Sequence, residues 1–222
     1  MDEKIIVDYS DPFFKGAQVF FPYLDEGFKH VQKQKIKDVF VRQRDEKCHT
    51  VSFDFLENCD FIEKFHWMVN ISKKSNVSGL YYLLQLREFR WLNDCIPVDF
   101  ARLSKIEVLH TFYYDGLLNL DALKSLKEFL LDSVKTNDLS FFPELDNLEY
   151  VRIINGRFTS ISGLERCKNL KELDLRNCHK LSDANSTLQK LPKLVSVRFD
   201  GCKKHDLNVD ELRLRIPHVW AD

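Results

Sequence analysis

The sequence predicts an α/β solenoid, in which short parallel strands and their return segments stack in a row. The stretch NLKELDLRNC (169–178) places Leu170, Leu173, Leu175 and Cys178 in an L-x-x-L-x-L-x-x-C spacing. The same spacing recurs along the chain at nearly constant intervals. Only seven glycines and six prolines occur among 222 residues, so few tight turns and no flexible linker are expected. These observations predict one continuous domain built from repeats.

The spacing fits seven times, at intervals of 24, 20, 20, 22, 22 and 24 residues. The first apolar residues of the seven copies are Ile62, Leu86, Ile106, Leu126, Leu148, Leu170 and Leu194. Another apolar residue usually stands three positions earlier, as Leu145 and Cys167 do. The stretch ISGLERCKNLKELDLRNC (161–178) is similar to the short repeats, of roughly 22 residues, of the leucine-rich repeat family. The resemblance covers about residues 60–205.

The x-L-x-L-x part of each copy predicts a short strand with one buried and one solvated face. The resemblance implies a parallel sheet on a concave face, with irregular, 3₁₀ or helical segments on the convex side. The Asn, Cys or small residue after the strand enters the turn, where it can satisfy buried backbone groups. No repeat buries its apolar face alone, so the ends of the array require caps.

Residues 1–58 are predicted to form an N-terminal capping region, residues 59–205 the repeats and residues 206–222 a C-terminal cap. In the first region, KDVFVRQ (37–43) and TVSFDFLE (50–57) alternate apolar and polar residues around a polar turn, which predicts a β-hairpin. At the other end, VDELRLRIPHVW (209–220) predicts a short helix stopped by Pro217 and then an edge strand. Trp220 is expected to plug the last repeat.

Period-2 geometry places three columns of side chains on the concave face. Such columns should be mostly polar, but apolar residues interrupt them, and a charged rim surrounds these residues. This pattern is typical of a partner-binding surface. The candidate binding residues are Met68, Arg90, Leu92, Val108, His110, Phe112, Tyr113, Glu128, Leu130, Tyr150, Arg152, Ile154, Asp174, Arg176 and Arg198. Two alternatives stay open: the N-terminal region or a helix covers part of the sheet, or one repeat is a residue out of register.

Composition narrows the class of partner. Thirty-three basic residues face 34 acidic ones, which argues against a nucleic-acid partner held by bulk positive charge. The short basic run at 29–37 is therefore interpreted as a solvated face. No signal peptide or membrane span is recognised, so a cytoplasmic protein with six free thiols is expected.

Neither a cofactor nor a metal is expected. Cys178 and Cys202 occupy the same place in adjacent repeats, with His179 and His205 nearby. However, cysteines at this position point into the turn while their neighbours point outward, so four convergent zinc ligands are not expected. Two buried thiols are the better interpretation.

The chain also has no Walker loop, G-x-G-x-x-G, H-E-x-x-H or G-x-S-x-G motif. The sequence therefore predicts a non-catalytic, monomeric protein–protein interaction module that binds a folded protein through its concave face, with no small-molecule substrate. Its design is similar to that of bacterial immunity or inhibitor proteins, which would make a toxin domain the partner. A regulatory or adaptor subunit is the main alternative. An enzyme using His30, Cys48 and His49, or a secreted internalin-like adhesin, is weaker, because the former lacks a recognisable spacing and the latter requires a signal peptide.

Overall fold

The computed structural model describes residues 4–10 and 14–221, which fall into two compact units. The first unit runs to His110 and also includes Asp115–Leu118. The second unit contains Thr111–Tyr114 and the chain from Asn119 onward. Strand β7 (Val108–Phe112) lies where the two units divide. In the described part of the chain, every helix is too short or too polar to cross a bilayer.

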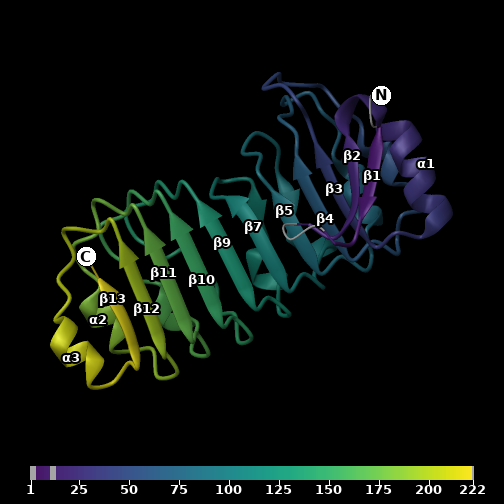
Figure 1. Cartoon of the computed structure of the whole chain (residues 1–222). Helices are drawn as coiled ribbons and strands as arrows, with labels where there is room; N and C mark the ends of the chain where they lie inside the picture. The colour runs from purple at the N-terminus through teal and green to yellow at the C-terminus, as the bar shows by residue number, and fades with distance from the viewer. Residues whose placement is uncertain (1–3, 11–13, 222) are drawn as a thin grey trace. The chain divides into compact units, whose positions relative to one another are not determined.

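Four parallel strands follow an N-terminal hairpin arm in the first unit (Figure 1). Strand β1 (Ile5–Asp8) pairs antiparallel with β2 (Gly16–Phe20). Strands β2, β3 (Asp38–Arg42), β4 (Lys64–Met68) and β5 (Glu88–Trp91) then pair in parallel. The helix α1 (Leu24–Gln34) connects β2 to β3, and 3₁₀ helices at Phe53–Leu56 and Ser78–Tyr82 make the next two connections.

Short elements complete the first unit. A 3₁₀ turn at Phe21–Tyr23 precedes α1, and another occurs at Phe100–Arg102. Strands β6 (Val98–Asp99) and β8 (Leu117–Leu118) pair in parallel as a separate small sheet. These elements belong to the return segments, which have little regular structure of their own.

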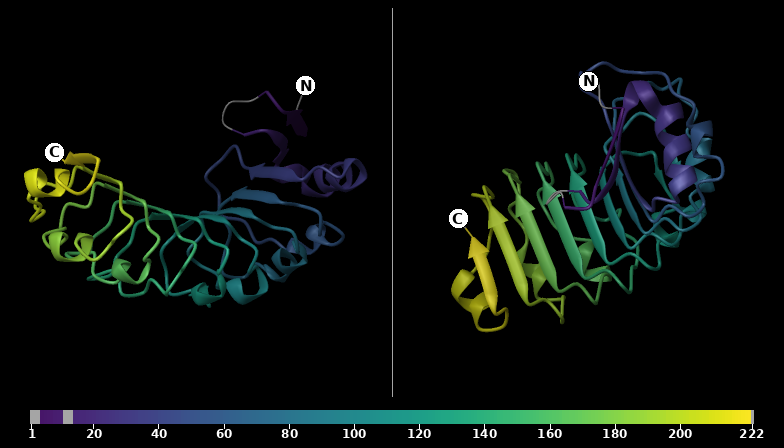
Figure 2. Two further views of the ribbon diagram at one scale, coloured as in Figure 1. Left: turned by 90° about the horizontal axis from the view of Figure 1, so that it is seen from below. Right: turned by 45° about the vertical axis from the view of Figure 1, so that its right-hand side comes forward.

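Five parallel strands in constant register form the second unit. They are β9 (Glu128–Asp132), β10 (Tyr150–Ile154), β11 (Glu172–Arg176), β12 (Ser196–Asp200) and β13 (His218–Ala221). Figure 2 shows the return segments together on one side of these strands. The segments contain 3₁₀ helices at Leu120–Ala122 and Leu164–Arg166, then α2 (Asn185–Leu188) and α3 (Val209–Arg213). No strand of this unit is out of register, which removes that alternative here.

The motif residues form the core, as predicted. In the second unit, Phe129, Val151, Leu173 and Val197 occupy one register row, and all are buried. In the first unit, Trp67 and Trp91 are fully buried beside aromatic rings such as Phe53. Each repeat thus covers its apolar side with the next, and this mutual burial provides most of the driving force for folding.

The turn that follows each of the strands β9 to β12 has the same backbone conformation. Ser133, Asn155, Asn177 and Gly201 all have a positive φ of 56–67°. Asn tolerates this left-handed conformation better than most residues, and Gly adopts it freely. The residue that follows each of these, at the last motif position, is buried: Val134, Gly156, Cys178 and Cys202. The last motif position therefore points into the turn, as expected.

The N-terminal hairpin was predicted from the wrong segments. Residues 38–42 are indeed a strand, but β3 pairs in parallel with both of its neighbours. Residues 53–56 are a 3₁₀ helix that buries Phe53 and Leu56, so their alternation comes from a short helix and not from a strand. The hairpin is formed instead by β1 and β2. Parallel pairing therefore begins well before residue 59.

At the C-terminus, the predicted short helix and final strand are confirmed, but the predicted position of the Trp220 side chain is wrong. A short helix, α3, and a final strand, β13, follow the last motif copy, with Pro217 between them. Trp220 does not plug the repeat, because it is 55% exposed. Leu212, Ile216 and Val219 fill that position instead and are buried.

Candidate binding surface

The candidate surface is the side of each strand row that faces away from the core, here called the strand face. Alternate strand residues point to this face because successive side chains leave a strand on opposite sides. The burial pattern confirms this alternation in β3, β4, β7 and β10, where buried residues alternate with partly exposed ones. The two units differ in how open their strand faces are.

The strand face of the first unit is partly covered by the N-terminal region. The ring of Phe14 lies 5.4 Å from that of Phe40 and 5.1 Å from that of His66, measured between centroids. Phe40 and His66 are neighbours in the register of β3 and β4. Phe14 is only 6% exposed as a result. The alternative in which the N-terminal region folds over part of the sheet is therefore confirmed for this unit.

A half-buried cluster of three ionisable side chains, Lys64, His66 and Glu88, lies beside the covered patch. Glu88 accepts hydrogen bonds at 2.7 Å from the Lys64 ammonium and at 2.7 Å from the His66 ring. Burial lowers the pKa of His66, and it outweighs the neighbouring carboxylate. Burial alone would raise the pKa of Glu88, but its hydrogen bonds with His66 and Lys64 lower it overall. All three groups are satisfied by one another, which indicates a structural role.

The strand face of the second unit forms three rows in register. The first row contains Glu128, Tyr150, Glu172, Ser196 and His218; the second contains Leu130, Arg152, Asp174, Arg198 and Trp220; the third contains Asp132, Ile154, Arg176 and Asp200. The apolar members of these rows, Leu130 and Ile154, are half-buried, and so is Tyr150. Polar and apolar groups therefore share one accessible surface.

The predicted binding residues are divided between the units. Met68, Arg90, Leu92, Val108 and His110 lie in the first unit, where all are half-buried. The remaining ten lie in the second: Phe112, Tyr113, Glu128, Leu130, Tyr150, Arg152, Ile154, Asp174, Arg176 and Arg198. Tyr113 stacks on Phe141 with ring centroids 3.9 Å apart, which ties it to a return segment.

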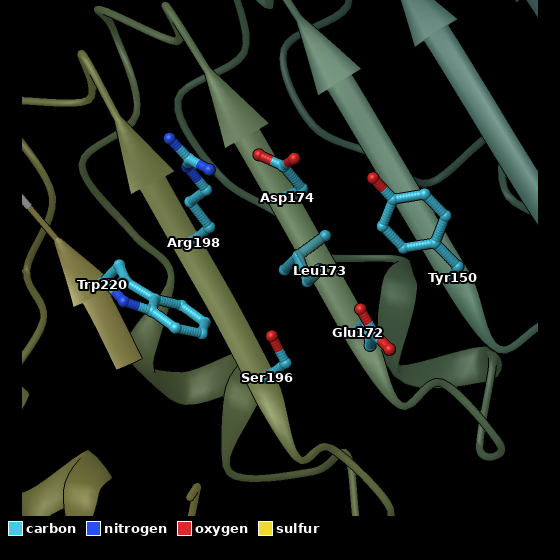
Figure 3. A pocket seen from close by; sticks show the side chains of 7 residues that line it. All are labelled: Tyr150, Glu172, Leu173, Asp174, Ser196, Arg198 and Trp220. Carbon is cyan, nitrogen blue, oxygen red and sulfur yellow. The ribbon is translucent and has the colours of Figure 1, made fainter. Parts of the chain in front are cut away.

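Two adjoining hollows indent the first row of the second unit. The larger has a volume of about 420 Å³, and Figure 3 shows its lining: Tyr150, Glu172, Leu173, Asp174, Ser196, Arg198 and Trp220. The smaller, of about 350 Å³, is lined by Lys127, Glu128, Glu149, Tyr150, Lys171 and Glu172. Tyr150 and Glu172 line both hollows, so together they form a depression that crosses several strands. The larger volume lies within the range of about 300–1,000 Å³ that is typical of ligand sites.

Most charges around the larger hollow are already neutralised. Arg176 donates from Nε to both carboxylate oxygens of Asp174, at 3.0 and 3.1 Å. This hydrogen bonding raises the pKa of Arg176. Arg198 lies 3.4 Å from Asp200, and Lys171 lies 2.8 Å from Glu149. Glu172 is different: within the described part of the chain, no hydrogen bond or ion pair reaches its carboxylate.

Sequence reasoning did not name four residues of the larger hollow: Leu173, which was expected in the core, and Glu172, Ser196 and Trp220. The signal for Trp220 was present, because Ile216, Val219 and Ala221 continue the motif spacing 22 residues after Leu194. That register places residue 220 on the strand face. Glu172 and Ser196 were in the correct column, but nothing local distinguished them from other polar surface residues.

The residues singled out as possible metal ligands or catalytic groups lie apart from the hollows. The described residues contain no group of three or more His, Cys, Asp or Glu side chains arranged to hold a metal ion. Cys178 and Cys202 are both buried, and a hydrogen bond between their thiols, together with burial, raises the pKa of Cys178. The ring of His49 packs on that of Phe21 at 4.2 Å, and in the described residues no hydrogen bond joins His49 to His30.

Comparison with solved structures identifies the architecture. An internalin (inlF) from Listeria monocytogenes has a TM-score of 0.55 and 14% identity, over 82% of this chain and 52% of that one. TLR13, in a complex with ssRNA13, has a TM-score of 0.53 and 17% identity, over 79% of this chain and 30% of that one. This chain thus spans about half the length of the first structure and less of the second. No family model matches the sequence.

Stacked parallel strands with short return segments define the class of solenoid proteins. Both similar structures are leucine-rich repeat proteins. The chain described here has the leucine-rich repeat fold, as its motif predicted.

Proposed function

We propose that this protein is a non-catalytic module that binds a folded protein partner through the strand face of its second unit. One observation carries the proposal: an accessible depression on a preformed sheet combines aromatic, aliphatic and charged side chains. A surface that is already ordered loses little conformational entropy on binding. Aromatic and arginine side chains are also the residues that most often dominate binding energy at interfaces.

The charge on this face favours a protein over a nucleic acid. Its three rows contain five carboxylates, Glu128, Asp132, Glu172, Asp174 and Asp200, against three guanidinium groups, Arg152, Arg176 and Arg198. A polyanion would be repelled by this excess, since nucleic-acid binding depends on neutralising phosphates with basic side chains. The RNA in the TLR13 complex is therefore not a model for the ligand of this face.

A narrower proposal concerns what binding achieves. An inhibitor or immunity protein that occludes a toxin enzyme would need no more than such a face, and a regulatory or adaptor subunit would use the same surface. The gene next to this one separates the two roles, because an immunity protein is expected beside a toxin gene. Six unpaired cysteines support a cytoplasmic location.

The test begins with capture of a partner from the native cell and its identification by mass spectrometry. Affinity for the purified partner is then measured by calorimetry. Tyr150→Ala and Arg152→Ala, both on the strand face, should each weaken binding about tenfold, a loss of about 1.4 kcal/mol. Lys190→Ala alters an exposed residue just after α2 and should leave affinity unchanged. If Lys190→Ala weakens binding while both strand-face variants retain it, the assigned face is wrong.

A further inference from the structure

The larger hollow combines two aromatic side chains with a carboxylate, that of Glu172, which makes no hydrogen bond or ion pair with the residues that the structure describes. Figure 3 shows Tyr150 and Trp220 on opposite sides, with Glu172 and Ser196 between them toward the N-terminal ends of β11 and β12. We propose that this hollow receives an arginine side chain of the partner protein. This inference rests on the proposed function, because it specifies what the partner presents to the strand face.

Trp220 provides the surface on which a guanidinium would stack. It is 55% exposed although it belongs to a strand, and its ring stacks on His218 with centroids 5.7 Å apart. Its register partner on β12 is Arg198, so it stands at the side of the hollow and does not form its floor. A cation over the face of a tryptophan is attracted by the ring, and the planar guanidinium suits this geometry better than a lysine ammonium.

Glu172 provides the opposite charge. It is the first residue of β11, it is exposed, and its register partners Tyr150 and Ser196 carry no charge. Of the two lysines that line the smaller hollow with it, Lys171 is paired with Glu149. The other carboxylate that lines the hollow, Asp174, is already held by Arg176. A guanidinium entering between Tyr150 and Trp220 would therefore find one free carboxylate to pair with.

An anionic side chain fits the hollow less well. Among the described residues that line the hollow, Arg198 alone is basic, and its guanidinium lies 3.4 Å from Asp200. A carboxylate approaching Arg198 would meet Asp174 in the next strand of the register and Glu172 in the first row. Repulsion from these carboxylates opposes binding of an anion, and Arg198 already has Asp200 as a partner. The charge arrangement thus selects a cation.

The experiment uses the full-length chain and the pentapeptide Ac-Gly-Gly-Arg-Gly-Gly-NH₂. A matched peptide carries citrulline, which keeps the shape of arginine and removes its charge. Binding is followed by the ¹H–¹⁵N signals of the tryptophan indoles, with that of Trp220 assigned from Trp220→Phe. The arginine peptide should shift the Trp220 signal saturably and leave those of Trp67 and Trp91 in place, since both are buried. The citrulline peptide should bind at least about fivefold more weakly than the arginine peptide.

Two variants make the charge requirement specific. Glu172→Gln should weaken binding of the arginine peptide about threefold to fivefold. Glu144→Gln removes the same charge from an exposed residue outside the strands and should have no effect. Equal binding of the arginine and citrulline peptides, full affinity in Glu172→Gln, or preference for a glutamate peptide would each overturn the proposal.

The outcome separates this inference from the proposed function. If a captured partner needs Arg152 and Tyr150 but the hollow does not discriminate arginine from citrulline, only the inference is wrong. If the arginine peptide binds as described while every captured partner ignores the strand face, the proposed function is wrong and the hollow stands as a cation site.

Discussion

Truncation of Leu173 to alanine tests whether stacking of the repeats stabilises the second unit. Leu173 is 1% exposed and lies in register between Val151 and Val197. The substitution removes roughly three buried methylene equivalents, at about 0.8 kcal/mol each, and leaves a cavity that adds to the loss. The free energy of unfolding should therefore fall by about 2–5 kcal/mol. Leu214→Ala is the matched control, because Leu214 is 89% exposed and should change stability little.

Urea denaturation followed by circular dichroism measures the loss, and amide hydrogen exchange locates it. Because each repeat packs only on its neighbours, protection should fall in β10 and β12 together with β11. A loss below about 1 kcal/mol, or one equal to that of Leu214→Ala, would show that Leu173 does not carry the stacking energy assigned to it. Loss of protection that bypasses β10 and β12 would contradict the nearest-neighbour argument.

Three further predictions concern backbone strain, thiol reactivity and pH. Gly163 has a φ of +113°, and a Cβ there would lie 2.2 Å from the carbonyl oxygen of Leu139. Gly163→Ala should therefore lower the free energy of unfolding by about 1–3 kcal/mol, measured by urea titration, and an unchanged midpoint would contradict this. Cys48 is exposed and should react first with a maleimide. Cys178 should react only on unfolding, because a hydrogen bond to a neighbouring thiol and burial raise its pKa. Mass spectrometry of the labelled native protein shows the order in which the cysteines react. Burial lowers the pKa of His66 below its unfolded value, so the unfolded state binds the proton more readily; the stability of the wild type relative to His66→Gln should rise as pH increases from about 5 to about 7, and a fall would reverse the assigned sign.

The repeat motif was sufficient to place the strands that it covers. Its first three apolar positions combine a period of two with an anchor three residues earlier, and each of these positions contributes directly to burial. β3 was assigned to a hairpin although Ile36, Val39 and Val41 fit the same spacing, 26 residues before Ile62. The last motif position is Arg44 there, not an Asn, Cys or small residue, so the turn signal was missing. A strand lies there because the apolar spacing, which buries surface, outweighs the turn residue.

The state of the strand face was harder to predict, because it depends on contacts far apart in the sequence. Period-2 geometry gives the direction of a side chain but not what covers it. Phe14 covers Phe40 and His66 only because β1 and β2 fold back as a hairpin, and no local pattern at Phe14 indicates that contact. The pair Asp174 and Arg176 was more accessible to prediction, since residues two apart on a strand share a face.

A partner should gain more binding free energy on the strand face of the second unit than on that of the first. Phe14 covers part of the first unit's strand face, whereas the second unit's strand face is open. A partner at the patch formed by Phe14, Phe40 and His66 would have to displace an aromatic ring that is already buried, at the cost of its apolar burial, about 1.5–3 kcal/mol for a phenylalanine. The depression at Tyr150 and Trp220 requires no such displacement, because Trp220 is already exposed to water. Binding there would bury the exposed ring of Trp220 and give Glu172 an ion-pair partner. The binding free energy from both contacts would not be reduced by the cost of displacing a buried ring.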